Sequence, residues 1–304
     1  MGRREEFREA MAVGRILLAD GAWGTELQKL GLDTGDCPEA WNVDRPDEIR
    51  KLTRAYAEAG ADLLMTNTFG GNRFRLRALE HHGKVEAYNR AGAAIAREVA
   101  DAHGKWVAAS VGPTGELIEP RGLASRRQMY EAFREQLEAL KAGGVDAVMV
   151  ETMSDPDEMR VAAQAAKDLE LYCFATMTFN PGPDGYRTYT GVTVAEAAQA
   201  LNESAADAAG TNCGTGLADM LHVVRQMRPL THKPLLVQAN AGLPQTVNGK
   251  LVYGDTPAHM AALLPDLIAA GAQVVGGCCG TTPEHVKAFR AVADALNAKR
   301  GPAA

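Results

Sequence analysis

Three cysteines in this chain have the type and spacing that suit a soft metal ion. Cys278 and Cys279 are adjacent and stand within a run of glycines, while Cys213 lies well upstream. Consecutive side chains on a regular strand point to opposite faces, so both can reach one ion only where the chain turns, and glycine permits that turn. Three thiolates suit Zn²⁺ and leave a fourth tetrahedral position open, as in catalytic zinc sites.

Two other interpretations of these cysteines stay open on spacing alone. Cysteine is among the most buried residue types, so all three could be free thiols packed in the core. A regulatory disulfide is the other alternative. Cys37, in a polar loop, and Cys173, inside an apolar run, are given non-ligand roles. The seven histidines fall in helical stretches or adjoining turns, which disfavours a histidine-ligated metal.

Two carboxylates, Asp20 and Glu151, each follow a short apolar run. Together they could form a general acid–base pair or could bind an ammonium group, and helix capping or a salt bridge is the alternative for each. The turn after Asp20 has exposed backbone N–H groups that can hold a carboxylate. An ammonium site beside a carboxylate site would recognise an α-amino acid. The residues of this turn are Gly21, Ala22, Trp23, Gly24 and Thr25.

Eight short apolar strands, each followed by a longer helical stretch, must position these residues. The strands are too apolar to be half exposed, which indicates a parallel sheet. Eight such units favour a single-domain (β/α)₈ TIM barrel over 1–304, with a core of about 16–298, and an open doubly wound sheet is the alternative. The predicted strands are 16–19, 63–66, 106–110, 147–150, 173–178, 208–211, 235–238 and 273–275. The predicted helices are 47–59, 85–103, 125–142, 155–168, 193–204, 216–227, 256–270 and 283–298.

Polar and thiol side chains stand at the carboxyl ends of these predicted strands. In a (β/α)₈ barrel those ends form one rim, and the chemistry is located there. The pattern therefore predicts that the cysteines, the carboxylates and two asparagines share one face of the barrel. The residues concerned are Asp20, Asn67, Glu151, Cys213, Asn240, Cys278 and Cys279.

Composition and charge exclude several other classes of protein. The chain has 304 residues, of which 46% are hydrophobic and 23% charged, as in ordinary globular proteins. A net charge of −6 without a long basic run gives no electrostatic case for nucleic acid. The charged N-terminal segment lacks the apolar core of a signal peptide, and no apolar run approaches the ~18 residues of a membrane span. We therefore expect a cytoplasmic protein.

Several motifs in the chain resemble those of the homocysteine S-methyltransferase family. The likeness runs from about 16 to 298 and is strongest to the homocysteine-binding barrel of the cobalamin-dependent methionine synthases. The pairing of Asn-Cys with a downstream Gly-Gly-Cys-Cys is the most specific part. The motifs are Asp20-Gly21-Ala22-Trp23-Gly24-Thr25, Thr66-Asn67-Thr68-Phe69-Gly70, Gly112-Pro113-Thr114-Gly115-Glu116, Asn212-Cys213 and Gly276-Gly277-Cys278-Cys279-Gly280-Thr281-Thr282-Pro283-Glu284-His285.

The resemblance implies a role for each residue at the strand ends. Cys213, Cys278 and Cys279 would be the ligands of a Zn²⁺ ion, and Asn240 would help to fill its fourth position. Asp20 and Glu151 would hold the amino group of homocysteine. The backbone around Gly21, Ala22, Trp23 and Thr25 would hold its carboxylate, and Asn67 is counted among the substrate contacts.

The resemblance also implies a methyltransferase reaction that converts homocysteine to methionine. The favoured methyl donor is methylcobalamin, carried by a separate corrinoid protein that docks over the rim. S-methylmethionine and betaine, which need no corrinoid, are the alternatives, and a non-catalytic homocysteine- or zinc-binding module is a further one. The chain departs from the family's pattern beside the metal, with Ala239 where proline is frequent and Leu243 where lysine or arginine is common.

Overall fold

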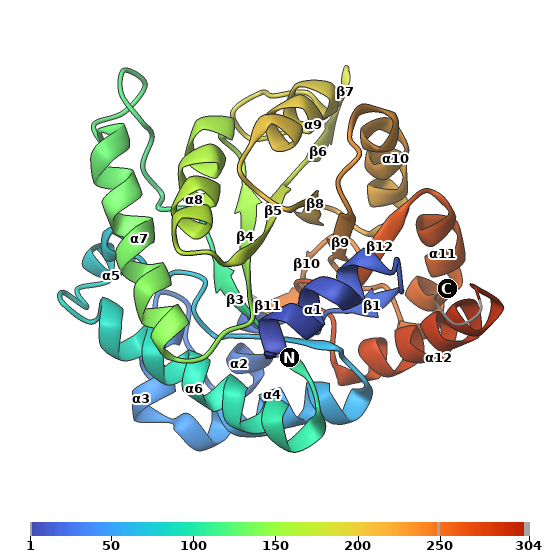
Figure 1. Cartoon of the computed structure of the whole chain (residues 1–304), viewed down its shortest axis with the longest axis horizontal. Coiled ribbons are helices and arrows are strands. Elements are labelled where there is room, and N and C mark those ends of the chain that lie inside the picture. Colours follow the sequence, from blue (N-terminus) through green and yellow to red (C-terminus); the bar gives the residue numbers. More distant parts are fainter. Residues whose placement is uncertain (1, 248–249, 301–304) are drawn as a thin grey trace.

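The computed structural model describes residues 2–247 and 250–300 and shows an eight-stranded parallel barrel (Figure 1). The strands are hydrogen-bonded in the order β1-β12-β9-β8-β5-β4-β3-β2. A parallel bridge from Ala19 to Leu63 joins the two ends of this order, which closes the barrel. The predicted (β/α)₈ fold is therefore confirmed. The barrel strands are β1 Leu17–Leu18, β2 Leu63–Met65, β3 Trp106–Val111, β4 Ala147–Met153, β5 Tyr172–Met177, β8 Ala208–Cys213, β9 Leu235–Ala239 and β12 Ala272–Gly277.

Eight helices alternate with these strands and surround the sheet, as the apolar periodicity predicts. They are α4 Pro46–Ala59, α6 Val85–His103, α7 Arg126–Ala142, α8 Pro156–Asp168, α9 Val194–Glu203, α10 Leu217–Met227, α11 Pro257–Ala269 and α12 Pro283–Arg300. Within the described residues, no helix combines the length and the apolar character needed to cross a membrane.

Shorter elements that the sequence does not predict occupy the two ends of the barrel. Helix α1 lies across the barrel in Figure 1, the short helix Arg228–Leu230 lies between α10 and β9, and the others insert between a barrel strand and the helix that follows it. They are the helices α1 Arg3–Ala12, α2 Gly24–Lys29, η1 Pro38–Ala40, α3 Trp41–Asp44, α5 Arg73–Ala78 and η2 Arg228–Leu230, and the strands β6 Asn180–Gly182, β7 Gly185–Arg187, β10 Gln245–Val247 and β11 Lys250–Val252.

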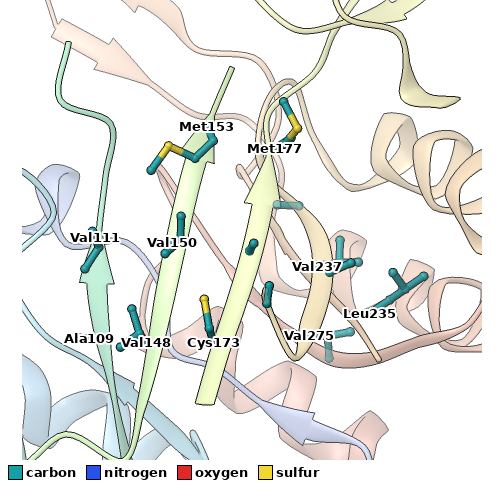
Figure 2. Close-up of a cluster of buried hydrophobic side chains, with 14 of the residues drawn as sticks. Ala109, Val111, Val148, Val150, Met153, Cys173, Met177, Leu235, Val237 and Val275 are labelled. Carbon is teal, nitrogen blue, oxygen red and sulfur yellow. The ribbon is translucent and has the colours of Figure 1, made fainter. Parts of the chain in front are cut away.

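Side chains of the barrel strands alternate between two apolar layers. On β4, Val148 and Val150 pack toward the helices, in the layer that Figure 2 shows, whereas Met149 belongs to the interior cluster. Phe7 of α1 joins that interior cluster and contacts the rings of Trp106, Tyr172 and Phe174 edge-on, with centroids 5.2–6.0 Å apart. Apolar side chains of α1 thus fill one end of the barrel interior, and the polar side chains lie at the carboxyl ends of the strands.

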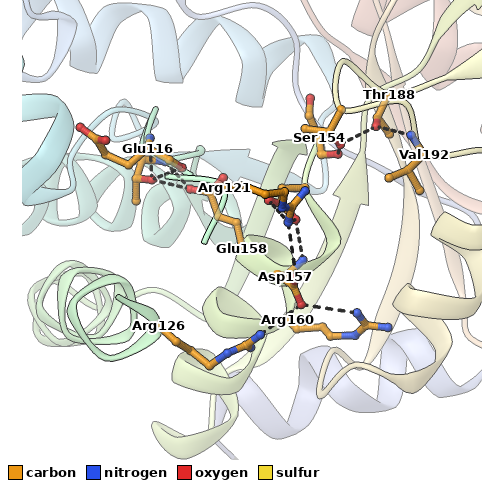
Figure 3. Close-up of polar contacts among 12 residues, drawn as sticks. Glu116, Arg121, Arg126, Ser154, Asp157, Glu158, Arg160, Thr188 and Val192 are labelled. Atoms are coloured by element: carbon orange, nitrogen blue, oxygen red, sulfur yellow. Dashed lines mark hydrogen bonds and ion pairs between the residues drawn. The ribbon is translucent and has the colours of Figure 1, made fainter. Parts of the chain in front are cut away.

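Ion pairs and hydrogen bonds fasten the loop after β3 to the start of α8 (Figure 3). Arg121 Nη2 lies 2.7 Å from Asp155 Oδ2, and Thr114 donates from its backbone and its hydroxyl to Glu158 Oε1, each over 2.6 Å. Asp155 in turn caps α8, since its side chain accepts from the Asp157 backbone N–H. This loop therefore stands over the carboxyl end of the barrel in a fixed position.

Gly210→Ala is expected to destabilise the barrel by about 3 kcal/mol, the upper end of overpacking costs. Gly210 on β8 faces Leu236 on β9, and a Cβ at this position would lie 2.0 Å from the Leu236 carbonyl oxygen. That oxygen belongs to the sheet and cannot move aside. Urea unfolding measures the effect, with Gly254→Ala as the control, because a Cβ at Gly254 would meet no atom within 4 Å. Equal midpoints for Gly210→Ala and the wild type would contradict this packing.

Candidate metal and amino-acid site

The structure brings the sulfurs of Cys213, Cys278 and Cys279 together at the carboxyl rim. Cys213 ends β8, and the vicinal pair follows β12. The three Sγ atoms all lie within 4.8 Å of one another. All three residues are partly exposed, whereas Cys37 and Cys173 are buried elsewhere. The rim cluster is therefore accessible to an ion and to a substrate.

Turns in the backbone aim these sulfurs at one point. Cys213 has a φ of 65°, in the left-handed region that residues with a side chain rarely adopt, and Gly280 has a φ of 81°. A Cβ on Gly277 would lie 2.1 Å from Thr281 Oγ1, so only glycine fits there. The same Thr281 hydroxyl donates to the Cys278 carbonyl over 2.7 Å. The glycines thus provide the break in strand geometry that two adjacent ligands require.

The charges of the three thiols depend on one another. Hydrogen bonds from Cys278 and Cys279 lower the pKa of Cys213. The hydrogen bonds with Cys213, together with burial, raise the pKa of Cys278 and of Cys279. The three thiols therefore share their hydrogen bonds, and a cation placed among the sulfurs would stabilise all three as thiolates.

Asn240 contacts Cys213 and carries a buried side-chain oxygen. Its Nδ2 donates to the Gly214 carbonyl over 2.6 Å, and its side chain also contacts Cys213. Its Oδ1 is buried and has no hydrogen-bond partner within 2–247 and 250–300. Buried polar atoms in native proteins almost always have a partner, so an orphaned acceptor on a residue that contacts Cys213 fits a cation bound near this cysteine. Three soft sulfur donors and one nearby oxygen fit Zn²⁺.

Asp20 is a fully buried carboxylate with one free oxygen. Its Oδ2 accepts from the Met65 backbone N–H over 2.8 Å and from Trp23 Nε1 over 3.4 Å. Its Oδ1 has no hydrogen-bond partner among the residues that the structure describes. Burial raises the pKa of Asp20 to about 8, and the charge of Glu151 adds to the rise. Such a carboxylate favours a positively charged ligand group at Oδ1.

Glu151 is the second carboxylate of the rim. Its Oε1 accepts from Ser110 Oγ, and its Oε2 accepts from Asn212 Nδ2 over 3.1 Å. Burial raises the pKa of Glu151 to about 7, and the neighbouring Cys213 adds to the rise. Within the described part of the chain, neither Glu151 nor Asp20 forms an ion pair with a Lys, Arg or His side chain. The salt-bridge alternative for these two residues therefore has no support.

The turn after Asp20 lies against the cysteine loop. Ala22 N–H donates to Thr281 Oγ1 over 3.1 Å, so this group is already occupied. Helix α2 begins at Gly24 without a side-chain cap, which leaves its first N–H groups available to an anion. Thr25 Oγ1 accepts from the Gly280 N–H over 3.1 Å and so joins the turn to the cysteine loop.

Asn67 uses both donor positions of its side-chain amide on neighbouring residues. Its Nδ2 donates to the Pro38 carbonyl over 2.7 Å and to Asn42 Oδ1 over 3.1 Å. The side chain is buried and fastens the segment of Pro38 to the barrel. A substrate contact from Asn67 stays a prediction.

Sequence reasoning missed two residues that shape the site. Asn212 is fully buried and donates to Glu151, and its place just before Cys213 at a strand end is the signal that could have found it. Tyr253 follows β11 and packs its ring over Gly280, where a Cβ would lie 2.2 Å from the ring. Nothing in the sequence near Tyr253 indicates this contact, because it depends on the hairpin of β10 and β11.

Known proteins resemble this chain along nearly its full length. The sequence profile of the family described as homocysteine S-methyltransferase matches residues 17–293. Methionine synthase from Mycobacterium leprae is 33% identical over 303 residues, which cover 93% of this chain and 25% of that protein. Methionine synthase from Mycobacterium tuberculosis is 32% identical over 90% of this chain and 24% of that protein. The chain thus spans about a quarter of the length of these relatives.

Solved structures give the same grouping. The homocysteine methyltransferase MmuM from Escherichia coli, in a metallated form, superposes with a TM-score of 0.75 at 25% identity, covering 91% of this chain and 96% of that one. The carboxyl transferase domain of Rhizobium etli pyruvate carboxylase, with a TM-score of 0.56 at 14% identity over 97% of this chain and 52% of that one, shares the fold alone. With its profile match and its sequence identity to the methionine synthases, the chain belongs to the homocysteine S-methyltransferase family.

Proposed function

We propose that this chain is a zinc-dependent homocysteine S-methyltransferase that acts as one homocysteine-binding barrel and produces methionine. The observation that carries the proposal is the set of three sulfurs within 4.8 Å of one another at a rim that also holds a buried carboxylate with a free oxygen. Membership of the family supports the reaction class.

Cys213, Cys278 and Cys279 would hold the zinc ion, with the side chain of Asn240 next to Cys213. When bound, zinc lowers the pKa of a coordinated thiol, which makes the homocysteine sulfur a nucleophilic thiolate at neutral pH. No side chain is then needed as a general base for the thiol. The two rim carboxylates are therefore assigned to binding rather than to proton transfer.

Asp20 and Glu151 would bind the ammonium group of homocysteine between them. The ammonium would give Asp20 Oδ1 the partner it lacks and would offset the burial of both carboxylates. The first N–H groups of α2, at Gly24 and Thr25, would hold the substrate carboxylate. With both polar ends fixed, the substrate side chain is free to extend toward the cysteines.

The methyl donor we propose is methylcobalamin on a separate corrinoid protein that docks over the rim. The sequence identity to two methionine synthases supports this donor. S-methylmethionine and betaine, which need no partner protein, form the second candidate. The likeness to a homocysteine methyltransferase over 96% of its chain favours that candidate.

A donor screen of the purified zinc-loaded protein is expected to yield methionine from homocysteine and methylcobalamin. The thiolate accepts the methyl group while the cobalt keeps the bonding electron pair, so methylcobalamin absorbance must fall as methionine forms. Parallel reactions contain S-methylmethionine or betaine instead. Turnover with S-methylmethionine or betaine alone would overturn the corrinoid donor. Homocysteine binding without turnover from any donor would identify a non-catalytic module.

A further inference from the structure

Asn212 uses every hydrogen-bonding position of its side chain on residues of the site. Its Oδ1 accepts from the Thr152 backbone N–H and from Thr176 Oγ1, each over 2.7 Å. Its Nδ2 donates to Glu151 Oε2 over 3.1 Å and to Thr152 Oγ1 over 2.8 Å. Because a backbone N–H can only donate, the atom facing it must be Oδ1, which directs Nδ2 toward Glu151.

This fully buried side chain has no atom left for a ligand. It therefore acts on the chemistry only through its neighbours. One neighbour is Glu151, the proposed ammonium-binding carboxylate, and the other is Cys213, which is next in the chain and is a proposed zinc ligand.

Two residues linked to Asn212 have an uncommon backbone conformation. Thr152 has a φ of 61° and Cys213 a φ of 65°, both in the left-handed region. Residues with a side chain hold such angles only when surrounding contacts fix them. Asn212 supplies two of these contacts to Thr152 and is peptide-bonded to Cys213. The side chain of Asn212 thus holds the end of β4, and its backbone leads directly into the cysteine ligand.

We propose that Asn212 is a positioning residue that couples amino-acid binding to zinc binding. The inference rests on the proposed function and deepens it. Zinc fixes Cys213, and Cys213 fixes Asn212, so that Glu151 is held ready for the ammonium group. An amino acid bound at Glu151 in turn steadies Cys213 for zinc. Coupling between two ligands is reciprocal, so zinc must raise the affinity for the amino acid by the same factor as the amino acid raises the affinity for zinc.

Norleucine is the probe for this coupling, because it has the ammonium and carboxylate of an α-amino acid but no thiol to bind zinc. Calorimetry measures its Kd on the zinc-loaded and the zinc-free protein. We expect zinc to tighten norleucine binding by about 5-fold or more, the lower range of allosteric coupling. A chelator competition with and without norleucine is expected to show the same factor for zinc.

In Asn212→Ala the ratio of the two norleucine Kd values is expected to fall to about 1. If the role of Asn212 were merely structural, its replacement would raise both Kd values and leave their ratio unchanged. Thr176→Val is the milder variant, since it removes only one hydrogen bond to Asn212 and is expected to lower the ratio in part. Thr53→Val is its control, because it removes one buried threonine hydroxyl bond within α4 and is expected to keep the full ratio.

The outcomes separate this inference from the proposed function. A wild-type ratio of 1, or a full ratio in both Asn212→Ala and Thr176→Val, overturns the coupling by Asn212 while amino-acid binding stands. Failure of norleucine to bind the wild type with or without zinc overturns the amino-acid site and the inference together. If Asn212→Ala does not fold, the comparison of Thr176→Val with Thr53→Val decides.

Discussion

Cys278→Ala is expected to abolish zinc binding and to reduce methyl transfer by more than about 100-fold, the upper end of the loss when only a residue that supports a metal ligand is replaced. Cys278 is one of three sulfurs that lie within 4.8 Å of one another, so its removal leaves only two thiolates for the ion. Two ligands do not hold zinc in a site whose fourth position must stay open to substrate. Metal analysis of the dialysed protein and a methionine assay measure the two effects.

Cys173→Ala is the matched control for this prediction. It also removes one sulfur, but from the layer between the barrel and the helices, which Figure 2 shows. We expect it to keep one zinc per chain and most of the activity, with a small loss of stability. Equal zinc content in Cys278→Ala and Cys173→Ala at low free zinc would mean that the ion binds elsewhere.

Asp20→Asn is expected to weaken homocysteine binding by about 2–4 kcal/mol, or roughly 30- to 700-fold, which is typical of losing one partner of a buried charge pair. The substitution keeps an oxygen to accept from the Met65 N–H. It places an amide where the free Oδ1 would meet the ammonium group. The fold should therefore survive while the binding charge is lost. Calorimetric titration of the zinc-loaded protein with homocysteine measures the change.

The pH dependence of binding gives a second test of Asp20. An ammonium group needs ionised carboxylates, and burial raises the pKa of Asp20 to about 8 and that of Glu151 to about 7. Norleucine has no thiol that could release a proton on binding, so its affinity is expected to rise between about pH 6 and 8 and to level off above, as the carboxylates ionise. Asp20→Asn should lose the upper part of this rise. A wild-type affinity that is flat over this interval would contradict the role of the carboxylates.

The same shift changes the stability of the protein without homocysteine. The pKa of Asp20 is higher in the folded state than its ordinary value of 3.8, so folding favours the protonated form. Its contribution to the free energy of unfolding is full at low pH and is lost as the pH rises toward about 8. The Asp20→Asn variant has no carboxyl group at this position, so its free energy of unfolding does not fall with pH for this reason. Thermal unfolding is expected to show that the stability of the variant relative to the wild type increases as the pH rises from 5 to 8. A difference in stability that stays constant over this interval would argue against the raised pKa of Asp20.

The regular part of the barrel could be predicted because its signal is local. Apolar runs of strand length alternate with helical stretches, and α6 has the predicted bounds of 85–103. The ends of strands are less predictable. β4 continues to Met153, beyond the predicted end at 150, through an irregular register between Val150 and Met153. Contacts from other strands set that irregularity, and spacing along one strand does not reveal them.

Helix α1 shows that tertiary packing can stabilise a helix for which the local sequence gives only a weak signal. Its segment is mostly charged, with Phe7 and Met11 as the buried apolar residues. The helix is held because these two side chains close the interior of the barrel, and because Gln273 Nε2 donates to the Met11 carbonyl over 2.7 Å. Such a partner lies at the other end of the chain and cannot be read from local periodicity.

The candidate site also contains some residues that could be predicted from the sequence and others that could not. Cys213, Cys278 and Asp20 could be found because each stands where a predicted strand ends, and a barrel brings all such ends to one rim. The function of Asn212 could not, because it depends on hydrogen bonds to Thr152 and to neighbouring strands. Residues that act by position along a strand are predictable, whereas those that act through several strands are not.

Zinc K-edge X-ray absorption, measured before and after the addition of homocysteine, tests the central claim most directly. The account predicts three sulfur neighbours at about 2.3 Å in the zinc-loaded protein and a fourth when homocysteine binds. Selenohomocysteine should replace that fourth sulfur with a selenium neighbour. A first shell of nitrogen and oxygen, or a sulfur count that homocysteine does not change, would contradict the account.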